Sequence, residues 1–215
     1  KKISSLENDK LNVETIIMNN KVKFELPYNG KHQILNSLIS LLVFHIFKVN
    51  FKTFIKLSPF LPKLSGRGKI YKIRFNNKTI NLIDESYNAS PLSLKATIIY
   101  FSDLIIDKKY KKFLVLGDML ELGCKTRFFH TEILKYLKVN LFYQVIICGE
   151  YIKVLYKSIK NRKNVYYFSK IEFLNNHLLK YIENEDIVLT KCSNATMVNQ
   201  YVQRIKKNKS QGMVS

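Results

Sequence analysis

The sequence has few cysteines and no motif that pairs them. Cys124, Cys148 and Cys192 are far apart, odd in number, and form no Cys-x-x-Cys pair or metal-ligand cluster. This distribution indicates reduced thiols rather than a disulfide framework. The longest apolar run, residues 34–47, contains Asn, Ser and His and is too short and too polar to span a bilayer. We therefore expect a cytoplasmic protein without membrane insertion.

Two glycine-rich nucleotide motifs are absent. No Gly-x-Gly-x-x-Gly occurs, so no dinucleotide is implied. No Gly-x-x-x-x-Gly-Lys-Thr occurs either, so the sequence holds no P-loop for nucleotide phosphates. With 215 residues, of which 47% are hydrophobic, the chain can bury one good core or a core plus a smaller unit.

Acidic residues are scarce: 36 Lys and Arg stand against 16 Asp and Glu, which gives a formal net charge of +20. Such a charge raises nucleic acid as a partner. A nucleic-acid footprint should cluster on one face or helix, whereas these lysines are scattered through every predicted element. No specific nucleic acid is therefore expected, and a basic nucleic-acid-binding α/β protein remains the weaker alternative.

Residues 1–65 are predicted to be α+β. Segments 13–18 and 22–26 alternate around a turn at Asn19-Asn20, which is typical of a hairpin. A second helical stretch is expected over 51–57, before prolines and a glycine mark a domain boundary between 65 and 66. Between the hairpin and this stretch a helix from Lys31 is predicted, with six apolar residues on its buried side: Ile34, Leu35, Leu38, Leu41, Leu42 and Ile46.

Residues 66–215 are predicted to form an α/β domain. Apolar strands alternate with helices, which implies βαβ units and a Rossmann-like, mostly parallel sheet covered on both faces. Strands are expected at 70–75, 79–83, 113–116, 145–148, 165–168 and 187–190. Helices are expected at 92–106, 127–137, 151–159, 171–182 and 197–206.

The candidate site follows the predicted strand at 79–83. Asp84 ends this strand, Tyr87 and Asn88 belong to the next turn, and Ser90 is suited to cap the following helix. Ligands of open α/β sheets bind at the carboxyl ends of strands. Taken alone, such residues are also common in ordinary turns and caps.

Two further strand-to-helix junctions carry polar groups and are expected at the same edge. One holds Asp118 and Glu121, and the other holds Lys191, Ser193 and Asn194. Convergence from three strands supports a binding site more strongly than any single residue.

Three motifs, in this order and spacing, resemble the Mur ligases of peptidoglycan synthesis. They are Gly66-Arg67-Gly68, the stretch from Leu82 to Ser93 (LIDESYNASPLS), and the stretch from Leu116 to Gly123 (LGDMLELG). The most similar type within the family adds D-alanyl-D-alanine to UDP-N-acetylmuramoyl-tripeptide. The resemblance extends over nearly the whole chain and implies the end of the family's central ATPase domain, 1–65, followed by its C-terminal domain, 66–215.

The resemblance implies an ATP-binding set: Asn36, Arg67, Asp84, Tyr87 and Asn88. Asn36 ends a stretch from Gly30 that looks like the family's Gly-x-His-x-x-x-Asn element, and Asp84 matches an aspartate that hydrogen-bonds the ATP ribose. Read without the family, His32 and Asn36 are more typical of a helix cap or surface, and Arg67 of an exposed loop.

The resemblance also implies a substrate-binding set: His32, Asp118, Glu121, His130, Lys191, Ser193 and Asn194. Residues 191–194 resemble a Lys-Gly-Ser-Arg element near the incoming dipeptide, but Cys192 and Asn194 replace Gly and Arg. The missing arginine puts recognition of the dipeptide carboxylate in doubt. His130 alone fits a core or capping role as well as a functional one, and a reactive thiol at Cys192 is a minor hypothesis.

The implied reaction uses ATP to phosphorylate the tripeptide carboxylate, after which the dipeptide amine attacks the carbonyl. The family's P-loop, magnesium ligands, modified lysine and UDP-sugar domain are missing from residues 1–215. No catalytic site is complete and no metal ligand is expected here, since Mg2+ would be held by the missing part. The chain begins with Lys1, which suggests a segment of a longer protein, and we expect a monomer that is inactive alone. A decayed, non-catalytic binding module is the main alternative.

Overall fold

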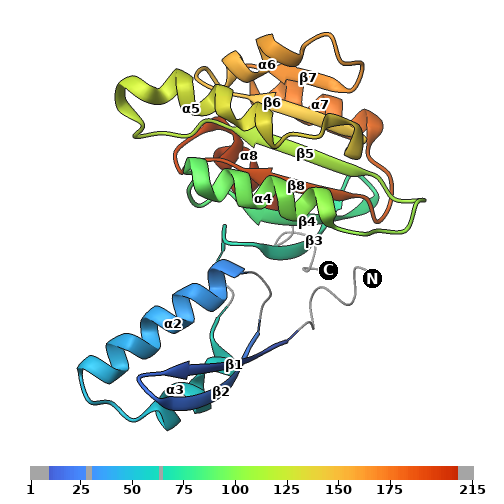
Figure 1. Cartoon of the computed structure of the whole chain (residues 1–215). Coiled ribbons are helices and arrows are strands. Elements are labelled where there is room, and N and C mark those ends of the chain that lie inside the picture. The colour runs from blue at the N-terminus through green and yellow to red at the C-terminus, as the bar shows by residue number, and fades with distance from the viewer. Residues whose placement is uncertain (1–9, 28–30, 63–64, 208–215) are drawn as a thin grey trace. The chain divides into compact units, whose positions relative to one another are not determined.

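The computed structural model describes residues 10–27, 31–62 and 65–207, apart from the side chains of Lys31 and His32. The chain divides into two compact units, Lys1–Lys63 and Leu64–Ser215. Each unit is described by itself (Figure 1).

The first unit contains an antiparallel hairpin. Strands β1, Leu11–Ile17, and β2, Asn20–Leu26, pair so that Ile17 lies opposite Asn20. The turn is therefore Met18-Asn19 rather than the predicted Asn19-Asn20. Both turn residues have positive φ, 45° and 62°, as the twist of a two-residue type I′ turn requires.

The described residues of this unit also form two helices and a 3-10 turn: α2, Lys31–Ile46, α3, Phe51–Leu57, and η1, Ser58–Phe60. The side-chain oxygen of Asn50 caps α3 by accepting a hydrogen bond from the Lys52 amide at 2.9 Å. The small core joins both strands to the helices through Val13, Ile17, Val22, Phe24, Leu26, Leu41 and Phe54.

The prediction for the buried side of α2 is partly wrong. Leu41 is buried, whereas Leu35 and Ile46 are 60% and 71% exposed and Leu42 is 38% exposed. Apolar residues continue around most of the helix, so their spacing alone did not indicate which side faces the hairpin.

The second unit contains a six-stranded sheet in the order β3-β4-β8-β5-β6-β7 (Figure 1). Strand β3 pairs antiparallel with β4, and every other neighbouring pair in this sheet is parallel. The predicted mostly parallel α/β fold is thus confirmed. The strands are β3, Lys69–Phe75; β4, Lys78–Glu85; β5, Lys112–Gly117; β6, Gln144–Cys148; β7, Val165–Phe168; and β8, Ile187–Lys191.

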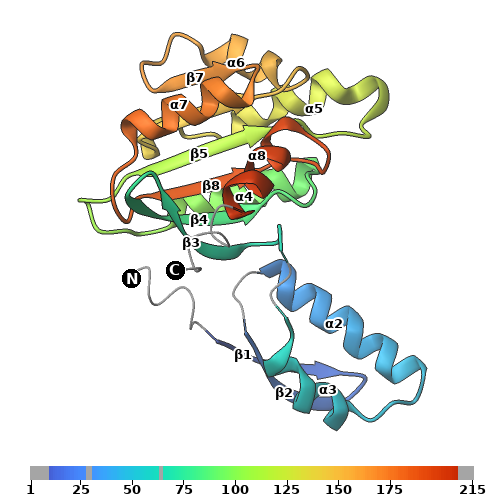
Figure 2. The same cartoon turned by 180° about the vertical axis from the view of Figure 1, so that it is seen from behind.

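Helices cover both faces of this sheet. Helices α4, Pro91–Asp103, and α5, Thr126–Glu132, lie on the face turned to the viewer in Figure 1. Helices α7, Ile171–Tyr181, and α8, Met197–Lys207, lie on the other face, which Figure 2 shows, and α6 covers Lys153–Ile159 beside β6 and β7. Short 3-10 turns are η2, Gly123–Lys125, η3, Ile133–Lys135, and η4, Val139–Leu141.

Two predicted helices end at least three residues earlier than expected. Helix α4 ends at Asp103 rather than 106, and the helix expected over 127–137 changes to a 3-10 turn after Glu132. The start of α4 agrees with the prediction, because Ser90 caps it, Pro91 is its first residue, and Ser93 completes a reciprocal capping box.

The main core lies between the sheet and the pair α7 and α8. Phe113 and Val115 of β5 point into it, so by strand alternation Leu114 and Leu116 point to the α4 face. Burial on both faces explains why the central strands β5, β6 and β8 each contain a continuous apolar run. Within the described residues, no helix is long and apolar enough to cross a membrane.

Candidate functional site

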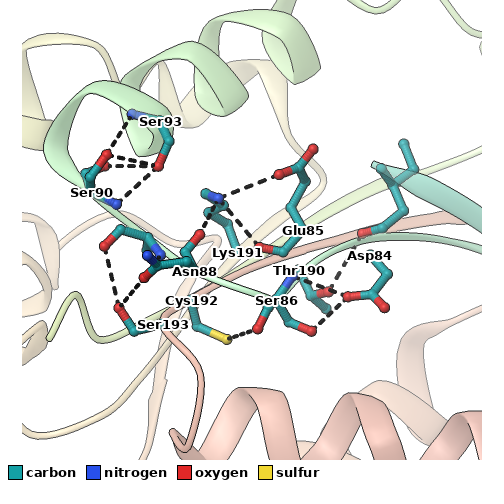
Figure 3. A network of polar contacts seen from close by, with 12 residues as sticks. Asp84, Glu85, Ser86, Asn88, Ser90, Ser93, Thr190, Lys191, Cys192 and Ser193 are labelled. Carbon is teal, nitrogen blue, oxygen red and sulfur yellow. Dashed lines mark hydrogen bonds and ion pairs between the residues drawn. The ribbon is translucent and has the colours of Figure 1, made fainter. Parts of the chain in front are cut away.

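The parallel register brings three predicted loops to one edge of the sheet. Glu85 at the end of β4 lies opposite Lys191 of β8, and Leu116 of β5 lies opposite the same lysine on its other side. The segments that follow these strands therefore begin at the same level, and Figure 3 shows the polar contacts between two of them.

Asp84 is completely buried, and its carboxylate fixes the loop between β4 and α4. Its Oδ1 accepts hydrogen bonds from the Ser86 amide at 3.1 Å and the Ser86 hydroxyl at 2.6 Å. Its Oδ2 forms an ion pair with Lys206 Nζ of α8 at 2.8 Å. Lys206 also donates to the Ser65 hydroxyl at 2.8 Å. Both carboxylate oxygens are thus occupied within the protein.

Ser86 and Asn199 connect this loop to the start of α8. Asn199 Nδ2 donates to the Ser86 carbonyl oxygen at 2.8 Å, and both residues are buried. Neither residue, nor Lys206, was a candidate from the sequence. Lys206 lies 122 positions from Asp84, and no local spacing signals a partner at that distance.

Lys191 is almost fully buried, which is rare for a lysine without a partner. Its ammonium group donates to the Asn88 carbonyl oxygen and pairs with the Glu85 carboxylate at 3.3 Å (Figure 3). The ammonium group also donates to the Glu85 carbonyl oxygen at 3.4 Å, so its charge holds the end of β4 and the loop that follows it.

Ser193 links all three loops. Its hydroxyl accepts a hydrogen bond from the Leu120 amide at 3.0 Å and lies 3.3 Å from the Ala89 carbonyl oxygen. The Asn88 side-chain oxygen is 3.5 Å away. This one hydroxyl, which belongs to the segment after β8, therefore contacts the segments after β4 and β5.

Asp118 fixes a fourth loop, which follows β6. Its Oδ1 accepts from the Ile152 amide at 2.7 Å and its Oδ2 from the Glu150 amide at 3.1 Å. Gly149 allows this approach, because it has a φ of +140° and a Cβ added there would lie 2.5 Å from the carboxylate. The aspartate therefore organises backbone amides.

His130 fastens the segment that follows Asp118. The Met119 amide donates to its Nε2 at 3.0 Å, so the ring proton lies on Nδ1, which donates to the Thr126 carbonyl oxygen at 2.8 Å. Burial lowers the pKa of His130, against smaller opposing effects of the Thr126 carbonyl and Asp118. A neutral ring with both nitrogens engaged shapes the loop and is not free to bind a substrate.

Three residues form what we call the exposed rim: Arg67, Tyr87 and Asn88. The Arg67 guanidinium lies 4.6 Å from the centroid of the half-exposed Tyr87 ring. The Gly66 carbonyl oxygen accepts from the Tyr87 amide at 3.1 Å, which joins the two segments. Within the described residues, neither the guanidinium nor the Asn88 Nδ2 has a hydrogen bond or ion pair, so both face solvent with donors available.

The other candidates are not part of this network. Asn194 is exposed, and its Oδ1 accepts a hydrogen bond from the Ala195 amide at 3.0 Å. Glu121 is exposed at a positive φ of 62°. Asn36 is exposed in the first unit, and the side chain of His32 lies outside the described residues.

The two buried thiols of this edge are unsuited to act as nucleophiles. Burial raises the pKa of Cys192 to about 12, and it raises the pKa of Cys148 still further. Cys192 Sγ lies 3.9 Å from the Ser86 carbonyl oxygen. The minor hypothesis of a reactive Cys192 is therefore not supported.

A metal cluster does not mark this edge in the part of the chain that the structure describes. In the described part of the chain, no group of three or more His, Cys, Asp or Glu side chains is arranged to hold a metal ion. A pocket of about 220 Å³ lies elsewhere and contains no predicted site residue; it is lined by Arg74, Phe75, Asn76, Ile171, Asn175, Leu179, Tyr201, Arg204 and Ile205.

The fold and this edge define an α/β domain whose strand-end loops are interlocked by buried polar side chains, with a small exposed rim of donors. The family model described as "Mur ligase, glutamate ligase domain" matches residues 67–194. The chain belongs to the Mur ligase family.

Two curated relatives carry the name UDP-N-acetylmuramoyl-tripeptide--D-alanyl-D-alanine ligase. The Rickettsia prowazekii protein is 27% identical over 194 residues, 90% of this chain and 42% of its own length. The Bacillus subtilis protein is 28% identical over 190 residues, 88% of this chain and 35% of its own length. The chain thus spans about two fifths of these relatives and matches their C-terminal portion.

Solved structures share the fold. A Thermotoga maritima MurF ligase in complex with ADP has a TM-score of 0.70 and 21% identity, covering 94% of this chain and 44% of that one. An Acinetobacter baumannii MurF has a TM-score of 0.71 and 18% identity, covering 91% of this chain and 42% of that one.

Proposed function

We propose that this chain forms the C-terminal part of an ATP-dependent ligase that joins D-alanyl-D-alanine to UDP-N-acetylmuramoyl-tripeptide in peptidoglycan precursor synthesis. Membership in the Mur ligase family and the shared name of the two curated relatives support this function. Action in the cytoplasm, as a monomer and without nucleic acid, belongs to the same proposal.

The reaction proceeds in two steps. The terminal carboxylate of the tripeptide attacks the γ-phosphorus of ATP, which forms an acyl phosphate and releases ADP. The amine of D-alanyl-D-alanine then attacks the acyl carbon, loses a proton, and expels inorganic phosphate as the amide bond forms. Catalysis of such transfers is mostly positioning and electrostatic stabilisation, so rigid loops with directed donors are what the protein must supply.

One observation carries the proposal: in the described residues, the donors of the exposed rim are unpaired, whereas the buried polar groups that support them are paired within the protein. Arg67 offers a guanidinium that is not neutralised by a carboxylate in the described residues, and such a group suits phosphate oxygens. Tyr87 offers a half-exposed ring and Asn88 a free amide donor beside it. We assign the nucleotide to these three side chains of the second unit. Asn36, an exposed residue of the first unit, stays a predicted ATP contact that rests on the family resemblance.

The buried residues serve by holding the rim in place. Asp84 is fully enclosed by Ser86 and Lys206, so we assign it to fixing the loop that carries Tyr87 and Asn88. Asp118, His130, Lys191 and Ser193 have the same supporting role for the neighbouring loops.

The described residues do not fit a magnesium site, since they contain no suitable cluster of ligands. The P-loop motif is absent from residues 1–215, and we propose that the chain needs the remaining part of the enzyme for ligation. Mg2+ and the triphosphate would be held by the remaining part of the enzyme.

A chimeric enzyme tests the proposal. It joins the part of the Rickettsia prowazekii ligase that precedes the matched region to this chain, and phosphate release is measured with ATP and both substrates. We expect turnover that requires both substrates, and an increase in the KM for ATP of about tenfold or more in Arg67→Gln, the loss expected for a charge-assisted hydrogen bond. The matched control is Arg127→Gln, an exposed arginine of α5. Equal KM values for the two variants would contradict the role of the rim.

One observation favours a second candidate, a non-catalytic binding module. Asn194 stands where the family resemblance expects an arginine, and its side chain is engaged with the adjacent Ala195 amide. In the chimera, Asn194→Arg should lower the KM for D-alanyl-D-alanine if this position contacts the dipeptide. A folded chimera that binds ATP but shows no turnover, with or without this change, would favour the binding module.

A further inference from the structure

A pocket of about 220 Å³, which we call the α7–α8 pocket, lies in the second unit on the sheet face that Figure 2 shows. It is lined by the end of β3 with the turn that follows, and by one side of each of the helices α7 and α8. Its residues on α7 are spaced four apart and those on α8 three and four apart, as expected for single helix faces. They are Arg74, Phe75 and Asn76; Ile171, Asn175 and Leu179; and Tyr201, Arg204 and Ile205.

The α7–α8 pocket is remote from the exposed rim. In the pairing of β3 with β4, Arg74 lies opposite Thr79, whereas Lys69 lies opposite Asp84 at the candidate site. The five residues between these two levels span about 16 Å of extended strand. Among the described residues, no residue predicted to bind ATP or substrate lines the pocket. A ligand in this pocket would therefore occupy a second site.

Two arginines give the pocket a positive charge. The side chains of Arg74 and Arg204 are exposed, and in the part of the chain that the structure describes neither guanidinium has a hydrogen bond or an ion pair. No Asp or Glu is among the described lining residues, and Glu172, which follows Ile171 on α7, is exposed. Guanidinium groups bind carboxylates and phosphates through paired hydrogen bonds. The charge of the pocket thus suits an oxyanion.

Tyr201 is a second, independent indication of a ligand. Its side chain is only 1% exposed, yet within the described residues its hydroxyl has no hydrogen-bond partner. Such buried, unpaired hydroxyls are uncommon because they cost free energy. Burial raises the pKa of Tyr201, so the hydroxyl keeps its proton and can donate. The side-chain amides of Asn76 and Asn175 also have no hydrogen bond in this part of the chain and offer further donors.

The size and the apolar part of the lining limit the ligand. A cavity of about 150 Å³ can hold a benzene molecule. The larger α7–α8 pocket therefore has room for one ring or a short chain together with a charged group. Phe75, Ile171 and Leu179 offer apolar contacts to the uncharged part of such a molecule.

We propose that the α7–α8 pocket binds a small organic anion. Its carboxylate or phosphate group pairs with the guanidinium groups of Arg74 and Arg204 and accepts a hydrogen bond from the Tyr201 hydroxyl. The uncharged part of the anion lies against the apolar lining residues. This site is independent of the proposed ligase function, because it shares no residue with the exposed rim.

Binding of phenyl phosphate and of benzoate to the full chain tests this assignment, with benzyl alcohol as a neutral probe of similar shape. Titration calorimetry gives the affinity, and the amide signals of residues 74–76 and 201–205 give the location. We expect the better of the two anions to bind with a Kd of about 1 mM or lower. Benzyl alcohol should bind at least about tenfold more weakly, because it lacks the charge. The preferred anion then identifies the charged group as a phosphate or a carboxylate.

Two double variants with the same net charge separate the pocket from general attraction to a basic chain. Arg74→Gln/Arg204→Gln should weaken binding about tenfold or more. The matched control is Arg127→Gln/Arg162→Gln, which alters two exposed arginines outside the pocket and should bind like the unaltered chain. The variant Arg67→Gln should also bind normally, because the rim is not the site.

Tyr201→Phe removes the hydroxyl and keeps the ring. It should weaken binding of the anion about fivefold. Without ligand it should melt at the same temperature as the unaltered chain or higher, because the lost hydroxyl is unpaired. A lower melting temperature would contradict the unpaired hydroxyl and overturn the proposal. So would equal binding of benzyl alcohol and the anions, equal losses in the two double variants, a loss of binding in Arg67→Gln, or no binding of any probe.

Discussion

Replacing Lys206 with Met should strongly destabilise the second unit, because it leaves the buried Asp84 carboxylate without its cationic partner. Asp84 is fully buried and its Oδ2 has the Lys206 ammonium at 2.8 Å. Removal of one partner of a buried ion pair costs about 3–5 kcal/mol. The lysine side chain is 14% exposed and Ser86 still donates twice to Oδ1, so the lower end applies. We expect a loss of about 3 kcal/mol, roughly a 150-fold change in the folding equilibrium.

Urea unfolding followed through the amide signals of β4 and β8 measures this loss. The matched control is Lys207→Met, the next residue of α8, which is exposed and should change the free energy of unfolding by less than about 0.5 kcal/mol. Adding Asp84→Asn to Lys206→Met should recover about 1–2 kcal/mol, because the stranded charge becomes a neutral amide. If Lys206→Met and Lys207→Met were equally stable, the buried ion pair would not support the loop.

Three other changes test the buried support of the site. Gly149→Ala should lower the free energy of unfolding in urea by about 2 kcal/mol or more, because its Cβ would meet the Asp118 carboxylate. The control Gly123→Ala, whose Cβ would meet open space, should lower it by about 1 kcal/mol. Equal losses would refute the steric argument. The folded-state pKa of His130 lies below its unfolded value, so stability should fall as pH drops from 7 toward 5, and His130→Gln should reduce that slope; an unchanged slope would assign it to other groups. In the native chain a thiol reagent should modify exposed Cys124 quickly and buried Cys148 and Cys192 only on unfolding; rapid loss of a second thiol would contradict their burial.

The sheet of the second unit was predictable because local signals and burial agree. Strands such as β5 and β8 are short apolar runs buried on both faces, and Ser90 with Pro91 marks the start of α4 directly. Helix α2 shows where such signals fail, since its apolar residues extend around the helix and do not indicate which side meets the hairpin.

The location of the candidate site could be predicted from the sequence, but its hydrogen bonds and ion pairs could not. The ends of β4, β5 and β8 could be located from the polarity switch after each apolar run. Which of their side chains face outward depends on partners far away in the sequence. Asp84 is enclosed because Lys206 reaches it from α8, and the Nε2 of His130 is occupied because the Met119 amide donates to it. Lys206 and Asn199, which the sequence did not suggest, follow only from tertiary packing.

The most direct test of the account is a ligation assay that compares this chain alone, the preceding part of the Rickettsia prowazekii ligase alone, and the two combined or fused. Product is measured as the tripeptide-linked D-alanyl-D-alanine formed with ATP. We predict product only when both parts are present, and loss of that product in Arg67→Gln at limiting ATP. Ligation by this chain alone, or none from a folded chimera that binds ATP and both substrates, would contradict the account.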